Sequence, residues 1–195
     1  MSFRLAPGSL PWVAIPFAAS ILVYPLSIAL SLIFLLVTAF MIHFHRDPER
    51  FPEGEGMLSP ADGRIVEADE RHIYIFMGPM DVHVNRSPLD GVVRSVEFRE
   101  GDHSPAFRNP LNNAHSVIEI EGETGRFTLK QISGMAARRV ICWVSPGDRL
   151  KRGQRIGMIR FGSGVIVTAP PGYRITAHKG SHVRAGQTVI AELRE

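Results

Sequence analysis

A long stretch without charge near the start of the chain sets the first limit on its fold. From Leu10 to Phe44 there is no Asp, Glu, Lys or Arg, and nearly every residue is apolar. A helix that spans a bilayer needs about 20 such residues, so this stretch is long enough to enter a membrane. Pro25 lies near its middle and is a helix breaker. We expect either one kinked span or a hairpin of two short helices, and we favour the hairpin.

A signal peptide and a buried soluble helix both fit this stretch less well. A cleaved signal peptide has a shorter apolar core and ends at a small-residue cleavage site. A buried helix of a soluble protein rarely runs so far without a charge. Basic residues flank the stretch on both sides, so the positive-inside rule gives no orientation, although a hairpin would leave both ends in the cytosol. We expect His45, Arg46 and Arg50 to anchor the apolar segment at the membrane interface.

The rest of the chain has a different pattern. Pro48 and Pro52 mark a linker, which separates a membrane-anchoring segment, residues 1–50, from a second domain, residues 51–195. In the second domain, runs rich in β-branched and aromatic residues alternate with Gly, Pro and Asp. This spacing predicts a mostly β sandwich or barrel. The expected strands cover 63–67, 72–76, 91–96, 115–120, 126–130 and 139–144.

Internal repeats narrow the fold further. Ser59–Val66 resembles Ser87–Val93, and the shared Pro-x-Asp-Gly is a turn signature that opens a strand. Pro146–Gln154 likewise resembles His178–Gln187. These turns are similar to those of biotinyl and lipoyl carrier domains, which are barrel-sandwich folds. Lys179 stands in Ala-His-Lys-Gly rather than in a carrier motif, so the resemblance implies the fold and not the carrier chemistry.

Charge and composition exclude several functions. The net charge is +3 and the pI about 9.4, with basic residues scattered among acids. This balance suits a membrane surface or a phosphate-bearing substrate, and we expect no nucleic-acid partner. Cys142 is the sole cysteine, so no disulfide framework or cysteine metal site is expected. The eight histidines include no HExxH or similar spacing, so we expect no metal.

A Gly-Ser-Gly triplet at 162–164 interrupts a strand pattern. Residues 155–161 precede it and residues 165–168 follow it, and both runs are rich in apolar residues. Glycine inside a strand often marks a β-bulge, and a bulge is what the triplet taken alone predicts. The alternative is a Gly162–Ser163 peptide bond that the protein cuts itself.

Four stretches favour self-cleavage over a bulge. They are FHRDPER at 44–50, LSPADG at 58–63, MDVHVNRSP at 80–88 and GQRIGMIRFGS at 153–163. In this order they resemble the phosphatidylserine decarboxylase family, specifically its short bacterial and archaeal form. ISGMAARR at 132–139 also resembles a family segment. The resemblance covers most of the chain, including the apolar start.

The resemblance implies a carboxy-lyase that is made as a zymogen. Autocatalytic cleavage would give a β chain, residues 1–162, and an α chain, residues 163–195, whose Ser163 becomes a covalent pyruvoyl cofactor. The pyruvoyl group would form a Schiff base with phosphatidylserine, and loss of carbon dioxide would give phosphatidylethanolamine, with no PLP or metal. The single cysteine and the apolar start lead us to expect attachment to the cytoplasmic membrane with the catalytic domain on the cytoplasmic side. The resemblance is compatible with a homodimer.

The motifs also assign candidate residues. Ser163 is the nucleophile, and a serine hydroxyl needs a base to take its proton. His83 is our candidate base and later proton donor, with Asp62 as the acid that orients it. Each has an ordinary alternative, since Asp62 suits a turn and His83 suits the polar face of an edge strand. Arginine side chains bind phosphate oxygens well. Our candidates for binding the lipid phosphate are Arg86, Arg138 and Arg139. The same residues are equally compatible with solvated surface charges.

The chain departs from the family at two positions. Longer members have a second histidine where Arg86 stands, so His83 would serve both steps or another residue such as His115 would substitute. Short members usually have Arg after the serine, where this chain has Gly164. Alternative functions are decarboxylation of an archaetidylserine-type ether lipid, decarboxylation of a soluble amino acid, which the apolar start disfavours, and a non-enzymatic membrane-tethered barrel-sandwich adaptor.

Overall fold

The computed structural model describes residues 4–101, 113–134, 140–160 and 163–194. The chain divides into two compact units, Met1–Glu49 and Arg50–Glu195. The first is helical and the second is built from strands, so each is described by itself.

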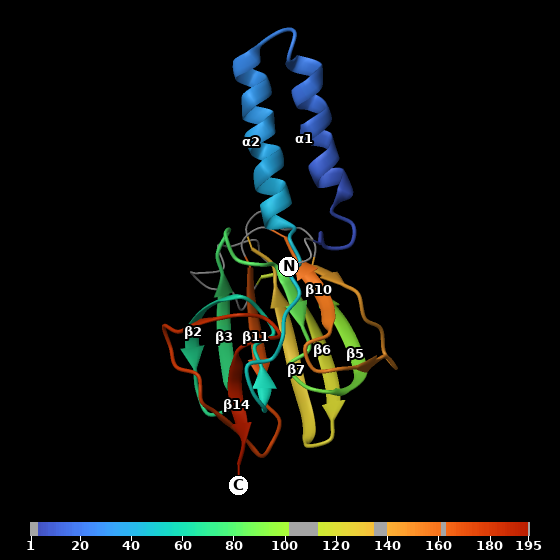
Figure 1. Ribbon diagram of the computed structural model, residues 1–195. Helices are drawn as coiled ribbons and strands as arrows, with labels where there is room; N and C mark the ends of the chain where they lie inside the picture. Colours follow the sequence, from blue (N-terminus) through green and yellow to red (C-terminus); the bar gives the residue numbers. More distant parts are fainter. Residues whose placement is uncertain (1–3, 102–112, 135–139, 161–162, 195) are drawn as a thin grey trace. The chain divides into compact units, whose positions relative to one another are not determined.

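The helical unit is a pair of antiparallel helices (Figure 1). Helix α1 covers Leu10–Val23 and helix α2 covers Ile28–Phe44. Pro25 lies in the turn between them, and the Ser27 hydroxyl caps α2 by accepting the Leu30 amide at 3.3 Å. The Ser31 hydroxyl donates to the Ser20 carbonyl at 2.8 Å and ties the helices together.

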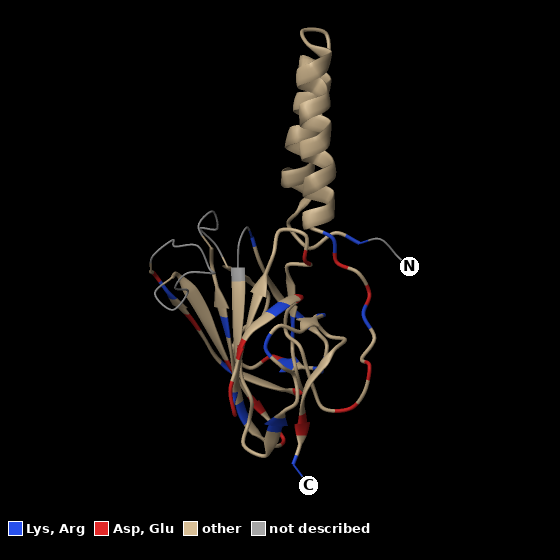
Figure 2. Cartoon of the chain, turned by 90° about the vertical axis from the view of Figure 1, so that its left-hand side faces the viewer, with Lys and Arg blue, Asp and Glu red and all other residues tan. Residues whose placement is uncertain are grey.

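Most of the helical surface is apolar and exposed. Figure 2 shows no Lys, Arg, Asp or Glu along either helix, in agreement with the sequence. Leu22 is 75 % exposed, and many other large apolar side chains of both helices are also exposed. Within the described residues, neither helix combines the length and apolar character that a membrane crossing requires.

The second unit is mostly β, as the strand pattern predicts. Its main sheet has eight strands in the order β13-β2-β3-β11-β7-β6-β5-β9 and is curled (Figure 1). Two three-stranded sheets have the orders β1-β14-β12 and β4-β10-β8. The strands are β1 Met57–Leu58, β2 Gly63–Ala68, β3 His72–Met77, β4 Val84–Arg86, β5 Gly91–Arg99, β6 His115–Gly122, β7 Gly125–Ile132, β8 Val140–Cys142, β9 Arg149–Leu150, β10 Arg155–Ile159, β11 Ser163–Thr168, β12 Tyr173–Ile175, β13 His182–Val183 and β14 Val189–Leu193.

Buried apolar side chains of the described residues form a hydrophobic core in this unit. In β2, β6 and β7, burial alternates along much of the strand, as the two-residue period of a strand requires. In β11, Val165 and Val167 are buried in this core, while Ile166 between them is only partly buried. The largest fully buried side chains of the unit include Phe127, Ile75, Ile118 and Leu129.

The expectation of one strand interrupted by a bulge at 162–164 is wrong. Strand β10 ends at Ile159 and belongs to a three-stranded sheet, whereas β11 begins at Ser163 and belongs to the eight-stranded sheet. Residues 160–162 therefore connect two sheets. A period of two predicts strands on both sides of this connection, but it does not say that the strands have different partners.

The internal repeat is a repeat in structure as well. Gly63 opens β2 and Gly91 opens β5, as the two Asp-Gly turns predict. In each copy, a serine hydroxyl donates to the carbonyl two residues on, at 2.7 Å: Ser59 to Ala61 and Ser87 to Leu89. The main chains of the copies bond to each other, through Arg86 N to Pro60 O at 2.9 Å and Leu58 N to Pro88 O at 3.0 Å.

Candidate functional site

The predicted cut lies in the connection between β10 and β11. Gly162 is outside the described residues, and for Ser163 only the backbone is described. Ser163 is the first residue of β11, where it pairs with Met77 of β3, and Gly164 pairs with Ile132 of β7. The residue after the predicted cut therefore starts a strand that has a neighbour on each side.

His83 lies next to the other end of this connection. Its carbonyl accepts the amide of Ile159, the last residue of β10, at 3.2 Å, and the following residue, Val84, pairs with Met158. The His83 side chain is fully buried. Strand pairing thus joins His83 to Ile159, which is three residues before Gly162, although His83 and Ser163 are 80 positions apart in sequence.

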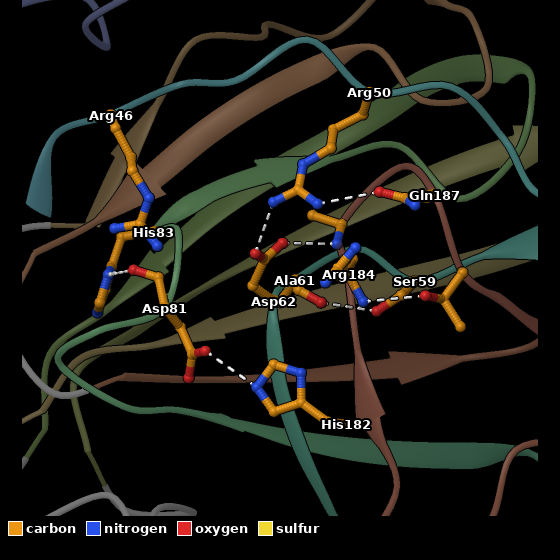
Figure 3. A network of polar contacts seen from close by, with 12 residues as sticks. Arg46, Arg50, Ser59, Ala61, Asp62, Asp81, His83, His182, Arg184 and Gln187 are labelled. Atoms are coloured by element: carbon orange, nitrogen blue, oxygen red, sulfur yellow. Dashed lines mark hydrogen bonds and ion pairs between the residues drawn. The ribbon is translucent and has the colours of Figure 1, made fainter. Parts of the chain in front are cut away.

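A main-chain carbonyl sets the orientation of the His83 ring. Its Nδ1 lies 2.9 Å from the carbonyl oxygen of Asp81 (Figure 3). A carbonyl oxygen only accepts, so Nδ1 must carry the hydrogen. In the neutral ring Nε2 then carries the lone pair, which is the arrangement a general base needs.

Asp81, which the sequence motifs did not single out, holds the turn before His83. Its Oδ2 accepts the Gly78 amide at 2.7 Å, and its own amide donates to the Gly78 carbonyl at 3.1 Å. Its Oδ1 lies 3.1 Å from Nε2 of His182, on β13 (Figure 3). An Asp two residues after Gly-Pro is a common turn signal and could have pointed to this role.

Asp62 is buried and ion-paired. Its Oδ2 accepts Nη2 of Arg50 at 2.8 Å, and its Oδ1 accepts the Ala185 amide at 2.7 Å (Figure 3). Nη1 of Arg50 donates to Oε1 of Gln187 at 3.0 Å. Arg50, expected at a membrane interface, is thus a partner of a candidate catalytic residue. That Asp62 orients His83 stays a prediction, because the contact described at Nδ1 of His83 is the Asp81 carbonyl.

A buried polar chain supports the strand after His83. Asn85 accepts Nε2 of Gln131 at 2.8 Å, and Gln131 accepts the Ser116 hydroxyl at 2.9 Å. All three side chains are fully buried, and they join β4, β7 and β6. Buried polar groups are stable only when bonded, so this chain fixes the position of β4. Sequence reasoning missed it, because its members are far apart along the chain.

The remaining predicted residues are placed as follows. Arg86 is 5 % exposed, and its Nη1 donates to the Gly153 carbonyl at 3.1 Å, which favours a structural role. Arg138 and Arg139 lie outside the described residues. His115 pairs with Ile132, which in turn pairs with Gly164 beside Ser163, so its strand position is near the site.

The packing around residue 164 explains why this position is a glycine in this chain. A Cβ at this position would lie 2.4 Å from Cε2 of Tyr74, because the ring of Tyr74 covers the glycine. Burial, with a smaller contribution from the charge of Glu67, raises the pKa of Tyr74, so its hydroxyl stays protonated at neutral pH. Tyr74 occupies the space that a side chain after Ser163 would need.

A metal centre has no support in the described part of the chain, where no three His, Cys, Asp or Glu side chains gather as ligands. The contacts described for His83 and Asp62 are hydrogen bonds and one ion pair with other protein groups. A buried histidine with one ring nitrogen fixed could take the proton of a nearby hydroxyl, and Ser163 at the start of β11 is the predicted nucleophile.

Comparison with known proteins shows the family of this chain. A family model described as phosphatidylserine decarboxylase matches residues 37–191. A protein of Archaeoglobus fulgidus named as an archaetidylserine decarboxylase proenzyme is 48 % identical over 88 % of this chain and 86 % of its own length. The phosphatidylserine decarboxylase proenzyme of Nitratidesulfovibrio vulgaris is 42 % identical over 83 % of this chain and 82 % of its own length. The phosphatidylserine decarboxylase proenzyme of Thermobifida fusca is 39 % identical over 95 % of this chain and 91 % of its own length.

The family match, residues 37–191, covers the predicted cut, His83 and Asp62. The matches show that the protein is an enzyme, so the alternative of a non-enzymatic adaptor is wrong. The chain belongs to the phosphatidylserine decarboxylase family, in its short bacterial and archaeal form, and is a carboxy-lyase whose relatives are named as proenzymes.

Proposed function

We propose that this chain cuts itself between Gly162 and Ser163 and then decarboxylates phosphatidylserine to phosphatidylethanolamine. Cleavage would produce a β chain, residues 1–162, and an α chain, residues 163–195, that begins with a pyruvoyl group. The observation that carries the proposal is the position of His83, whose main chain bonds to the last residue of β10, next to the predicted cut.

Self-cleavage requires a hydroxyl after the cut and a base to take its proton. The Ser163 oxygen attacks the Gly162 carbonyl carbon, the C–N bond breaks, and the hydroxyl proton passes to the released amine, which gives an ester. Loss of the Ser163 α-proton expels the Gly162 carboxylate, and water then replaces nitrogen as ammonia leaves. His83 Nε2 is the base in this scheme, and Gly162 leaves its carbonyl open to attack.

The strand that follows the cut suits a pyruvoyl group at its start. Pairing of Ser163 with Met77 and of Gly164 with Ile132 would hold the new chain end in place. When present, the group supplies an electron sink for the electron pair that remains when carbon dioxide leaves, as PLP does in other enzymes. The protein must then return a proton to that carbon, and His83 is the residue we assign to this step.

We assign the helical unit to the cytoplasmic membrane, with the β unit on the cytoplasmic side. At 1.5 Å per residue, α1 and α2 are about 21 and 26 Å long, less than the roughly 30 Å of a hydrocarbon core. Their exposed apolar surface supports insertion from one side. Both ends of the pair then face the leaflet that contains the substrate headgroup.

Archaetidylserine is a second candidate substrate. The relative of Archaeoglobus fulgidus, at 48 % identity, is named for this lipid. Both lipids have the same serine headgroup, on which the residues named above would act. The difference lies in the tails, ether-linked in one and ester-linked in the other.

A direct test measures carbon dioxide release from lipids labelled in the serine carboxyl group. Wild-type full-length protein and Ser163→Ala are mixed with vesicles that contain either diacyl phosphatidylserine or archaetidylserine, and free serine serves as the control substrate. We expect release from a serine lipid by the wild type alone, and none from free serine. A fully cleaved wild type that leaves both lipids intact would contradict the proposed reaction.

A further inference from the structure

Asp62 and Asp90 occupy matching positions in the two repeated turns. Each accepts one backbone amide from the turn that packs on it. Oδ1 of Asp62 accepts the Ala185 amide at 2.7 Å, and Oδ1 of Asp90 accepts the Arg152 amide at 2.5 Å. This hydrogen bond to a packed turn is therefore common to both aspartates.

The surroundings of the two carboxylates are otherwise different. Asp90 is exposed, whereas Asp62 is 5 % exposed and has a second partner, Arg50, at 2.8 Å. The Arg50 side chain is itself only 13 % exposed. Its guanidinium is fixed further by Gln187, which also donates to Glu53 at 2.6 Å. A buried ion pair has a large desolvation cost, and the Asp90 turn forms in an exposed setting without incurring it.

We propose that Arg50 is a positioning residue that keeps Asp62 ionised and oriented for the reaction. The inference rests on the proposed function, because it assumes that Asp62 takes part. A buried carboxylate without a counter-charge tends to take up a proton. An arginine always carries its charge, and its planar fork can hold the carboxylate and Gln187 together.

The arrangement also joins the two sides of the predicted cut. Arg50 and Asp62 precede it, whereas Ala185 and Gln187 follow it. The α chain would thus supply the Ala185 amide that bonds to Asp62 and the Gln187 side chain that bonds to Arg50. Cleavage would leave these contacts unchanged, because they do not involve the connection between β10 and β11.

The test compares five forms of the full-length protein in detergent micelles: wild type, Asp62→Asn, Arg50→Ala, Arg50→Lys and the matched control Asp90→Asn. The measured rates are those of fragment formation and of carbon dioxide release. We expect losses of about tenfold or more for Asp62→Asn and Arg50→Ala, a smaller loss for Arg50→Lys, and less than twofold for Asp90→Asn. Millimolar guanidinium should restore Arg50→Ala but not Asp62→Asn.

Two outcomes would overturn the inference. One is a wild-type rate for Arg50→Ala where Asp62→Asn is slow. The other is a slow Arg50→Ala that neither lysine nor guanidinium restores, since this would indicate only a damaged fold. If the wild type itself stays uncut, the proposed function fails. Carbon-13 NMR of the Asp62 carboxyl group then still tests whether Arg50 keeps Asp62 ionised. The Asp62 carboxyl should then protonate at higher pH in Arg50→Ala than in the wild type, and an unchanged titration would contradict the inference.

Discussion

At the scale of single residues, the site depends on main-chain groups as much as on side chains. The His83 ring is oriented by the Asp81 carbonyl, and the Asp81 side chain holds the turn that aims this carbonyl. The Asp81 side chain accepts the amide of Gly78, three residues back, and so fixes the local turn. The Asp81 carbonyl in that turn accepts the hydrogen on Nδ1 of the buried His83 ring.

Replacing Asp81 should therefore slow self-cleavage. In Asp81→Ala the turn loses its bonds to the Gly78 amide and to His182, and we expect cleavage to slow by about tenfold to a hundredfold, because small displacements of a catalytic group are costly. Asp81→Asn, which can still accept the Gly78 amide, should recover most of the rate. The measurement is the time course of fragment formation on a denaturing gel.

Asp69 offers a matched control for this prediction. Its Oδ1 accepts the amides of Arg71 and His72 at 2.8 and 2.7 Å and lies 3.2 Å from the His72 ring, so it is also a turn aspartate beside a histidine. It lies at the opposite end of β3 from Met77. Equal slowing by Asp69→Ala and Asp81→Ala would show that turn stability, and not His83, is responsible.

A second prediction concerns Gly164. A methyl group at this position would meet the Tyr74 ring, so Gly164→Ala should lower the free energy of unfolding by about 1–3 kcal/mol, the usual cost of overpacking. The effect should shrink when Tyr74 is changed to Leu, which is a test by double-mutant cycle. Chemical denaturation in the uncut Ser163→Ala background gives the values.

Gly54→Ala is the control for that cycle. Its added Cβ would have its nearest contact at 3.7 Å, an ordinary distance. If Gly164→Ala is as harmless as Gly54→Ala, the close packing of Tyr74 on Gly164 is wrong.

Among the strands, those of the predicted α chain pair with strands of the predicted β chain. Strand β11 lies between β3 and β7, β13 pairs with β2, and β14 pairs with β1. Val165 and Val167 of β11 are buried, and each contributes about 1.5–3 kcal/mol. The covalent link at 162–163 is therefore one of many connections between the two parts.

This topology predicts that the fragments stay together after cleavage. Cleaved wild type should elute from size exclusion at the volume of uncut Ser163→Ala, and the α chain should separate only in denaturant. Mass spectrometry of the eluted peak identifies both fragments. Loss of residues 163–195 from the native peak would contradict the strand pairing described above.

The elements were also the part that sequence could predict best. The patterns at 63–67, 72–76, 91–96, 115–120 and 126–130 are confirmed by β2, β3, β5, β6 and β7. The pairing of β10 and β11 with different sheets was not predictable, because alternation does not name a partner. Asp81 and Arg50 were missed for a related reason, since their roles arise from contacts with residues far along the chain.

At the scale of the whole molecule, an apolar helical unit accompanies a polar β unit. If the helices insert in a membrane, their exposed side chains provide the affinity. Replacing Leu22 and Leu26, which are 75 and 84 % exposed, with Asp should weaken binding to vesicles by at least tenfold, because each loses the gain of burying an apolar side chain. Flotation with phospholipid vesicles measures the bound fraction.

The control uses exposed apolar residues of the β unit. Phe98 and Leu193 are 63 and 56 % exposed, and their replacement with Asp should leave vesicle binding within twofold. Equal losses in both pairs would argue against a membrane role that is specific to the helices.

Every step of the proposed reaction depends on one chain becoming two at Gly162–Ser163. The most direct measurement is the intact mass of the denatured protein, before and after treatment with borohydride. We predict two fragments, 1–162 and 163–195, with the second blocked at its N-terminus, lighter than its sequence by the change from serine to pyruvoyl, and heavier by two hydrogens after reduction. Ser163→Ala should give one mass. A wild type of full mass with a free N-terminus, in a preparation that releases carbon dioxide from lipid, would contradict the account.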